Sequence, residues 1–386
     1  MQQALALARS LAPRLGITRV ARVTGLDRVG IPVWTAFRPN GQSISVTQGK
    51  GVDDDAAQAS AVFEAIELAV AEAPHPLAFE ATRAELTAAG RPTLKTRRFV
   101  QKGQSEAADD EPLRWVEGLN LISGEPIFVP EEIAGMTEVP DRRYWQRSDG
   151  LGAGSNLFEA AIHGICELIE RDAMALWSFR GDSEIDEREI ASADLQSSVV
   201  ADAEARIADA GMRLRLFDIT SDIRVPSFLA LLMPTDRAAA DMGYLDMAAG
   251  SATHPFAVRA ALGAIAEAAQ TRLTTIAGSR DDVHPEEYER ALPLDLAAYA
   301  RPGKSSGRSV AFAAEYAGPK NLPGRLDWLV ECVRSRGIRT LALAPLAPPD
   351  LPFTVARTIA PELEQDPRSG MRDLGRRALA AMLGQR

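Results

Sequence analysis

Cysteine and histidine are scarce in this chain. Its 386 residues include two cysteines, Cys166 and Cys332, and four histidines. So few thiol and imidazole groups exclude a disulfide scaffold and a zinc framework built from Cys and His. Any metal ion that the chain binds would therefore have mainly oxygen ligands.

Positive charge and long apolar runs are also in short supply. Lysine and arginine number 43 against 53 acidic residues, which gives a net charge of −10. Binding to nucleic acid requires clustered basic side chains, so we expect no nucleic-acid partner. No apolar run approaches the ~18–20 residues of a membrane span, so we expect no membrane partner. The N-terminus has two arginines inside its apolar stretch, which favours a cytoplasmic protein over a targeting signal.

The remaining pattern is that of a folded protein with helices and strands. Hydrophobic residues make up 46% and charged residues 25% of the chain. Alternating segments predict strands, and three Ala/Glu-rich segments predict long helices. We expect a short helix at 4–15, strands within 19–37, 43–48, 113–130, 213–217, 227–233 and 341–344, a glycine-rich turn at 150–154, and long helices at 53–73, 155–177 and 256–278. This mixture predicts an α+β fold with mixed sheets.

The first long helix carries an unusual polar stripe. Ser60, Glu64 and Glu67 follow the spacing i, i+4, i+7, so they share one narrow line of the helix. The rest of the helix is apolar, which predicts that two carboxylates project into a largely covered environment. Buried carboxylates are costly unless they are paired or bound to a cation. The alternative interpretation is a pair of glutamates lining a solvent groove.

Carboxylates recur on the other two long helices, where each polar stripe could equally be a solvated face. The positions are Glu159, Glu167, Glu170 and Arg171 on the second helix, and Glu267 with Gln270 on the third. Hard oxygen ligands suit Mg²⁺, which commonly binds through a few carboxylates together with phosphate oxygens. Arginines such as Arg171 and Arg272 would then reach the phosphates.

Other candidate motifs are weaker. The segment 303–305 (GKS) has the end of a P-loop, but Ala298 occupies the place of its first glycine. The glycines of 150–154 lack the spacing of a dinucleotide-binding motif. We interpret Cys166 as a structural thiol, because neighbouring carboxylates raise a thiol pKa. Lys50, between two glycines, is either a phosphate contact or a solvated turn lysine.

These segments, in this order, resemble the YcaO-domain family, ATP-dependent enzymes that modify peptide backbone amides. Residues 49–67 (GKGVDDDAAQASAVFEAIE) resemble its Gly-Lys-Gly segment and following Ser-x-x-x-Glu-x-x-Glu. Residues 148–173 resemble its glycine-rich entry and Glu-(x)7-Glu-x-x-Glu-Arg helix, and residues 264–282 resemble its third segment. Segments 23–34 and 351–364 also fit, so the similarity spans almost the whole chain.

The resemblance implies a YcaO fold with long helices around a central cleft that binds ATP and Mg²⁺. Glutamates would hold Mg²⁺, and Arg171 is the best candidate for stabilising the transferred phosphoryl group. With Arg272 added by the charge argument, the expected cofactor-binding residues are Ser60, Glu64, Glu67, Ser155, Glu159, Glu167, Glu170, Arg171, Glu267, Gln270 and Arg272. The expected metal ligands are Glu64, Glu67, Glu159, Glu167, Glu170 and Glu267.

The resemblance is strongest to members that work beside a TfuA-type partner. It implies O-phosphorylation of a backbone amide and installation of a thioamide in a ribosomally made peptide or protein. Alternatives are an azoline-forming cyclodehydratase, a non-catalytic nucleotide-binding scaffold for a precursor peptide, and a carboxylate-rich metal hydrolase acting without ATP. A homodimer is a further expectation from the resemblance.

We expect one catalytic domain over 1–386. Its subregions 1–98, 113–290 and 309–386 would be joined by loops at 99–112 and 301–308.

Overall fold

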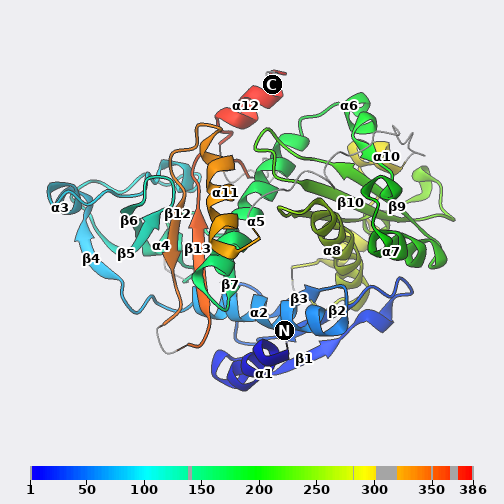
Figure 1. The fold of residues 1–386 in the computed structure, drawn as a ribbon, viewed down its shortest axis with the longest axis horizontal. Helices are drawn as coiled ribbons and strands as arrows, with labels where there is room; N and C mark the ends of the chain where they lie inside the picture. Colours follow the sequence, from blue (N-terminus) through cyan, green and yellow to red (C-terminus); the bar gives the residue numbers. More distant parts are fainter. Residues whose placement is uncertain are drawn as a thin grey trace.

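The computed structural model describes residues 2–137, 141–280, 282–300, 320–348, 351–365 and 373–384. Its strands form three antiparallel sheets, and helices lie between and over them (Figure 1). The expected α+β fold is confirmed, although the described sheets are antiparallel and not mixed. The loop expected at 301–308 lies outside the described residues.

The first sheet belongs to the N-terminal part of the chain. It has the order β1 (Arg19–Arg22), β2 (Val33–Phe37), β3 (Val46–Lys50). Helix α2 (Asp54–Ala71) follows β3 and packs on β2 and β3, and α1 (Gln2–Leu11) packs on α2. The helix expected at 4–15 therefore ends at Leu11, and a short 3₁₀ turn that contains Pro13 follows it.

The second sheet combines strands that are distant in the sequence. Its order is β4-β5-β12-β13-β7, with β6 paired to β5. The strands are β4 (Phe79–Thr82), β5 (Pro112–Asn120), β6 (Glu125–Pro130), β7 (Leu151–Gly154), β12 (Ala342–Pro345) and β13 (Thr354–Ile359). The C-terminal part of the chain thus lies in the middle of a sheet whose other strands come from residues 79–154.

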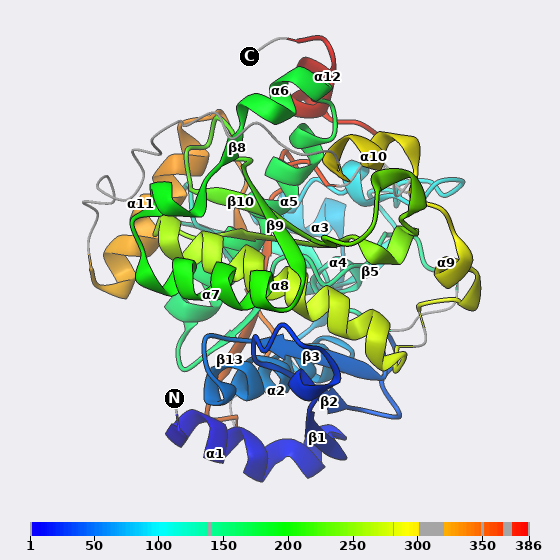
Figure 2. The ribbon, with the colours of Figure 1, turned by 90° about the vertical axis from the view of Figure 1, so that its right-hand side faces the viewer.

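The third sheet has the order β11 (Ala248–Thr253), β10 (Ser227–Pro234), β9 (Met212–Asp218), β8 (Glu189–Ile190). Helices α7 (Ser198–Asp209) and α8 (Ala257–Ala277) cover one face of it (Figure 2). The apolar residues of this face of the sheet and of the two helices form one buried cluster, which also includes Val29 and Ile31.

Helix α5 (Leu157–Trp177) lies between the second and third sheets. It contacts β7 and β13 on one side and β11 on the other, and α11 (Leu322–Arg334) packs along it. Its Ile165 and Ile169 are fully buried. A helix with sheets on two sides must be apolar over most of its surface, and polar residues that it buries, such as Asp172, need partners.

The other elements are short connections. They are α3 (Arg83–Ala88), α4 (Glu131–Ala134), α6 (Asp182–Glu187), α9 (Pro285–Glu289), α10 (Leu294–Ala300) and α12 (Arg376–Met382), with 3₁₀ turns Ala12–Leu15, Thr24–Leu26, Arg97–Phe99, Ser192–Leu195, Ala239–Asp241 and Tyr244–Asp246. Within the described residues, no helix is both long enough and apolar enough to cross a membrane.

The glycine-rich residues before the second long helix form a strand and not a turn. Residues 150–154 were expected to turn, but Leu151–Gly154 form β7, which pairs with β13. Gly250 likewise lies within β11. A Cβ atom on Gly49, Gly152 or Gly250 would lie 1.9 Å from Ala61 N, 2.3 Å from Ala160 O or 2.2 Å from Ala268 N. Glycine therefore lets each strand touch the backbone of the helix that follows it.

Replacing Gly250 with alanine should force α8 away from β11. The added methyl group has no room against the helix backbone, so we expect a loss of about 1–3 kcal/mol in the free energy of unfolding. Urea denaturation measures it. Gly25→Ala is the matched control, because nothing lies within 4 Å of the Cβ position there. Equal stability of the two variants would contradict the close strand–helix contact.

Candidate functional site

Each of the three carboxylate-bearing helices follows a strand that its own backbone touches. Helix α2 follows β3, α5 follows β7 and α8 follows β11. Side-chain caps fix the first two helix starts: Asp53 accepts a hydrogen bond from Ala56 N at 2.8 Å, and Asn156 accepts one from Glu159 N at 3.1 Å. The close contact of each helix with its strand glycine restrains the rotation of the helix about its axis, and with it the direction of the glutamates.

Strand β7 and Gly150, the residue before it, bind carboxylates of both α2 and α5. Ala153 N donates a hydrogen bond to Glu67 Oε1 at 2.7 Å, and Gly150 N donates one to Glu167 Oε2 at 2.9 Å. The charge of Glu167 also acts on Glu67, raising its pKa. Glutamates from separate helices therefore meet along one short stretch of backbone.

Strand β11 stands beside the carboxylates of α5 and α8. Ser251 Oγ donates a hydrogen bond to Glu170 Oε1 at 2.7 Å. The charge of Glu267 on α8 raises the pKa of Glu170. The second and third helices thus contribute to the same acidic cluster as the first.

Two cations lie within this cluster. Lys50 Nζ, at the end of β3, is 2.6 Å from Glu267 Oε2. Arg171 lies 3.2 Å from Glu167 and 3.9 Å from Glu170, and its Nε is 3.3 Å from Asp149 Oδ1.

The carboxylates hold the two cations firmly charged. Burial disfavours the charged form of Lys50, but the charges of Glu267, Glu170 and Glu64 outweigh burial and raise its pKa. Burial likewise opposes the charge of Arg171, and Glu167 and its acidic neighbours raise that pKa. Lys50 is therefore an ion-pairing residue and not a solvated turn lysine in this structure.

Three glutamates of the cluster resist ionisation. Burial raises the pKa of Glu64 to about 7, helped by the charge of Glu67 and opposed by Lys50. Burial raises the pKa of Glu67 to about 8, and that of Glu170 to about 8. Raised carboxyl pKa values of this kind are typical of functional sites, because like charges packed together do not stabilise a protein core.

Two further expected residues, Glu159 and Ser155, lie at the start of α5. Glu159 Oε2 accepts hydrogen bonds from Ser155 N at 2.8 Å and from Ser155 Oγ at 2.7 Å. Among the described residues, no hydrogen bond or ion pair joins this pair to the other glutamates. Their place at the site stays a prediction.

The remaining expected residues divide into two groups. Ser60 is exposed on α2, and the buried Gln270 Oε1 has no hydrogen-bond partner among the described residues. Arg272 is instead committed elsewhere, because its Nε donates to Asp27 Oδ2 at 2.7 Å. The structure therefore pairs Arg272 with Asp27 and does not bring it to the carboxylate cluster.

Sequence analysis missed two polar contacts of the cluster. Asp149 is 8% exposed and binds Arg171, and Ser251 binds Glu170. Asp149 directly precedes the glycine-rich segment that leads into α5, which is a signal that could have found it. Ser251 lies on a strand that sequence analysis did not predict.

The arrangement fits a divalent cation held together with an anionic ligand. The cluster has two cations, Lys50 and Arg171, but a larger number of carboxylates. These are Glu64, Glu67, Glu167, Glu170 and Glu267. In the described parts of the chain, no three His, Cys, Asp or Glu side chains are already arranged as ligands of one metal ion. Mg²⁺ keeps several waters and uses only one or two carboxylates besides phosphate oxygens, so it needs no such ready-made group.

A family model covers most of the chain. Residues 48–364 match YcaO cyclodehydratase, described as ATP- and Mg²⁺-binding. A protein from Rhizobium leguminosarum bv. trifolii, described as lying in the tfuA 3′ region, is 38% identical over 386 residues, covering 96% of this chain and 89% of its own length. A protein from Methanothermobacter thermautotrophicus is 28% identical, covering 91% of this chain and 90% of its own length.

Solved structures share the fold. YcaO from Methanopyrus kandleri bound with AMPPCP and Mg²⁺ matches with a TM-score of 0.73 at 21% identity, covering 97% of this chain and 94% of that one. A heterocyclase in complex with substrate and cofactor matches with a TM-score of 0.76 at 18% identity, covering 94% of this chain and 52% of that one.

The raised pKa of Glu67 predicts a pH-dependent stability in the metal-free protein. A carboxyl whose pKa is about 8 when folded and ordinary when unfolded destabilises the fold as pH rises from about 4.5 to 8. Glu67→Gln should therefore be more stable than the wild type, on the order of 2 kcal/mol at pH 8.5 and little at pH 5. Urea denaturation in EDTA measures the difference.

Glu125→Gln is the control for this measurement, because Glu125 is an exposed glutamate on β6. It should show no gain that grows with pH. A wild-type stability that exceeds that of Glu67→Gln at pH 8.5 would contradict the burial of this carboxylate.

Proposed function

The chain belongs to the YcaO family, with ATP and Mg²⁺ as cofactors, and from this premise we propose that it activates a peptide backbone amide by O-phosphorylation. The observation that carries the proposal is the meeting of carboxylates from α2, α5 and α8 around Lys50 and Arg171. Such a cluster cannot bind a triphosphate directly, because both are negative. It can do so when divalent cations stand between them.

Each expected residue has a proposed part. The glutamates Glu64, Glu67, Glu159, Glu167, Glu170 and Glu267 would hold Mg²⁺. Ser60, Ser155 and Gln270 would contact the nucleotide, and the unpartnered Gln270 Oε1 supports its share of this assignment. The role of Arg272 in binding phosphate has less support, since its guanidinium already pairs with Asp27.

Arg171 is the residue we propose to stabilise the transferred phosphoryl group. Its guanidinium is oriented by Asp149 at 3.3 Å and Glu167 at 3.2 Å, and those carboxylates keep it charged. A fixed cation requires no reorganisation when negative charge develops in the transition state. Bound Mg²⁺ would neutralise the same charge as a Lewis acid.

The chemistry overcomes the poor leaving ability of an amide oxygen. A nucleophile adds to the carbonyl carbon, and the oxyanion so formed accepts a phosphoryl group from ATP. The oxygen then leaves as phosphate, and the new substituent remains. External sulfide as nucleophile gives a thioamide, whereas a Cys, Ser or Thr side chain of the substrate gives an azoline.

We favour thioamide installation with a TfuA-type partner. Its support is the relative described as lying in the tfuA 3′ region, which shares 38% identity with this chain. The cyclodehydratase alternative is supported by the solved heterocyclases with the same fold. A homodimer and a peptide or protein substrate belong to the same proposal, as does a scaffold role as the non-catalytic alternative.

We further propose that 1–386 acts as one catalytic unit. The second sheet supports this view, because its strands β12 and β13 lie between β5 and β7. The subregions 1–98, 113–290 and 309–386 would then be parts of one structure and not separate domains.

Removing one carboxylate distinguishes a catalytic role from the role of a non-catalytic nucleotide-binding scaffold. Glu167→Ala removes a partner of Arg171 and Gly150, so we expect peptide-stimulated ATP hydrolysis to fall by about 100-fold or more. Phosphate release measures it. The control is Glu117→Ala, at an exposed glutamate of β5. Wild-type protein that binds Mg·ATP but hydrolyses none with any peptide would favour the scaffold.

The product identifies the nucleophile. We expect mass spectrometry of a candidate peptide, incubated with ATP, Mg²⁺, sulfide and the TfuA-type partner, to show oxygen replaced by sulfur. Loss of water from the peptide would support azoline formation and contradict the thioamide proposal. The same incubation without ATP is the control.

A further inference from the structure

Helix α8 is held by the first sheet and its β1–β2 connection at two points on different sides of the helix. Lys50, at the end of β3, lies 2.6 Å from Glu267. Five residues further along α8, Arg272 donates hydrogen bonds to Asp27 from Nε at 2.7 Å and from Nη2 at 3.3 Å. At about 100° per residue, positions 267 and 272 lie roughly 140° apart around the helix axis. Figures 1 and 2 both show the first sheet beside α8.

The segment that carries Asp27, residues 24–31, is fixed at both ends. At its start, Thr24 Oγ1 donates a hydrogen bond to Val33 O at 3.1 Å and accepts one from Val33 N at 3.0 Å. At its end, Val29 and Ile31 are buried in the apolar cluster of α8 and the third sheet. Segment 24–31 is therefore a firm link between β2 and α8.

The two contacts on α8 belong to one closed path through the first sheet. Val33 lies directly opposite Lys50 in the ladder of β2 and β3. Segment 24–31 is bound to β2 at Val33 and to α8 at Arg272. The path closes because Lys50 is bound to α8 at Glu267. A shift of α8 along or away from β3 would therefore have to break a contact of segment 24–31.

The pair of Asp27 and Arg272 is suited to hold two elements together. Their side chains are 7% and 24% exposed. The carboxylate of Asp27 also accepts a hydrogen bond from Arg28 N at 2.8 Å, which orients it. An ion pair that is mostly buried and has two hydrogen bonds is stronger and more directional than a pair on the surface.

We propose that Asp27 and Arg272 are positioning residues for the nucleotide site. The pair keeps α8 against β3, and thereby keeps Glu267 beside Lys50 and the carboxylates of α2 and α5. Neither residue of the pair would touch the nucleotide. This inference rests on the proposed function, because it takes the carboxylate cluster as the site that binds Mg·ATP.

A direct contact between Arg272 and a phosphate group is the rival role. In that case Asp27 competes with phosphate for the guanidinium, so neutralising Asp27 would leave nucleotide affinity unchanged or raise it. The positioning role predicts the opposite result. Loss of either partner opens the same path, so each substitution should weaken binding, and the two together should cost no more than one.

The test is a double-mutant cycle on the binding of Mg·AMPPCP to the full chain, measured by isothermal titration calorimetry. The variants are Asp27→Asn, Arg272→Gln and both together. The double variant leaves no unpaired buried charge, so it keeps the test usable if a single substitution unfolds the protein. Arg188→Gln is the matched control, because the Arg188 side chain is also 24% exposed and pairs with Asp218 at the β8 edge of the third sheet.

We expect Asp27→Asn and Arg272→Gln each to weaken binding by about 10-fold, and the double variant to weaken it by no more than about 10-fold. Arg272→Lys keeps a charged hydrogen bond to Asp27 and should stay within about threefold of the wild type. Arg188→Gln should stay within about twofold.

Hydrogen exchange without nucleotide gives a second measurement of the same pair. Amide exchange of segment 24–31 and of β3 should be faster in Asp27→Asn than in the wild type, and Arg188→Gln should leave it unchanged. This measurement reports on the hold of the first sheet on α8 and needs no bound ligand.

Three results would overturn the proposal. The first is unchanged or tighter binding of Mg·AMPPCP by Asp27→Asn, which would favour a phosphate contact of Arg272. The second is a double variant that binds as well as the wild type, or one whose loss is the product of the single losses. The third is unchanged exchange of β3 in Asp27→Asn. A wild type that binds no Mg·AMPPCP, while Asp27→Asn speeds exchange of β3, would contradict the proposed function and not the hold of the pair on α8.

Discussion

The repulsion between partly buried carboxylates is the constraint on which the site depends. Glutamates of α2, α5 and α8 are held near one another, although burial and their mutual charge oppose ionisation. Main-chain N–H groups of Gly150 and Ala153 and two cations balance only part of that charge. A protein that keeps such a cluster gives up stability for affinity toward cations.

Close strand–helix contact is what holds the glutamates against this repulsion. Each helix touches the glycine of the preceding strand so closely that no side chain fits between them. The helices therefore cannot turn about their axes or move apart to separate the charges. The same close contact occurs three times, at Gly49, Gly152 and Gly250, which explains why each strand has glycine at a position where strands usually favour a larger side chain.

Much of this arrangement could be predicted from periodicity. Glu64 and Glu67 stood out because an otherwise apolar helix has no other use for a thin polar stripe, and the structure places them in the cluster. The interpretation of Cys166 as a structural thiol agrees with the structure, because burial and the charge of Glu170 raise the pKa of this thiol to about 12. The prediction of a turn at 150–154 was wrong, because a sequence does not distinguish a glycine required by contact with a helix from a glycine required by a turn.

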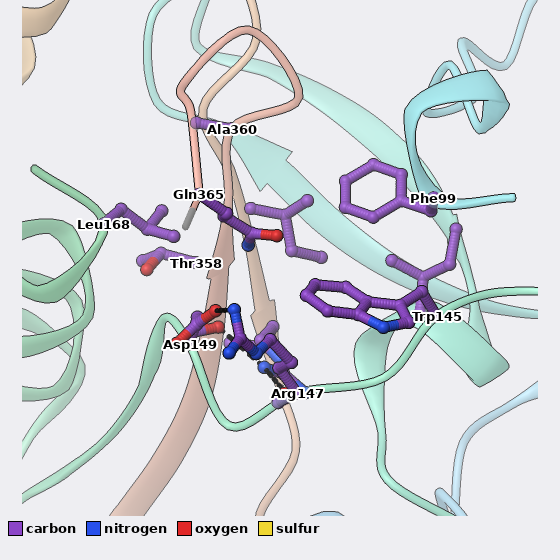
Figure 3. Close-up of a pocket in the computed structure, with 11 residues that line it drawn as sticks. Phe99, Trp145, Arg147, Asp149, Leu168, Thr358, Ala360 and Gln365 are labelled. Carbon is purple, nitrogen blue, oxygen red and sulfur yellow. Dashed lines mark hydrogen bonds and ion pairs between the residues drawn. The ribbon is translucent and has the colours of Figure 1, made fainter. Parts of the chain in front are cut away.

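Other features could not be predicted because they depend on contacts between distant residues. The engagement of Arg272 with Asp27 joins residues 245 positions apart, and nothing local to either signals it. The ion pair of Lys50 with Glu267 is equally remote, so the sequence left the role of this lysine open. The small hollow in Figure 3 is lined by Phe99 of η3 (Arg97–Phe99), Leu168 of α5 and Arg357 of β13. These residues are far apart in the sequence, so no local pattern predicts it.

Strand β7 has a consequence for the order in which the ribosome can build this protein. Its hydrogen-bonded neighbour in the sheet is β13, with Gly154 opposite Thr354. Because the backbone of β7 and of Gly150 just before it binds Glu67 and Glu167, the cluster needs β13, a late segment of the chain, to complete its frame. A nascent chain arrested before β13 would carry every glutamate of the cluster and still lack the strand with which β7 pairs.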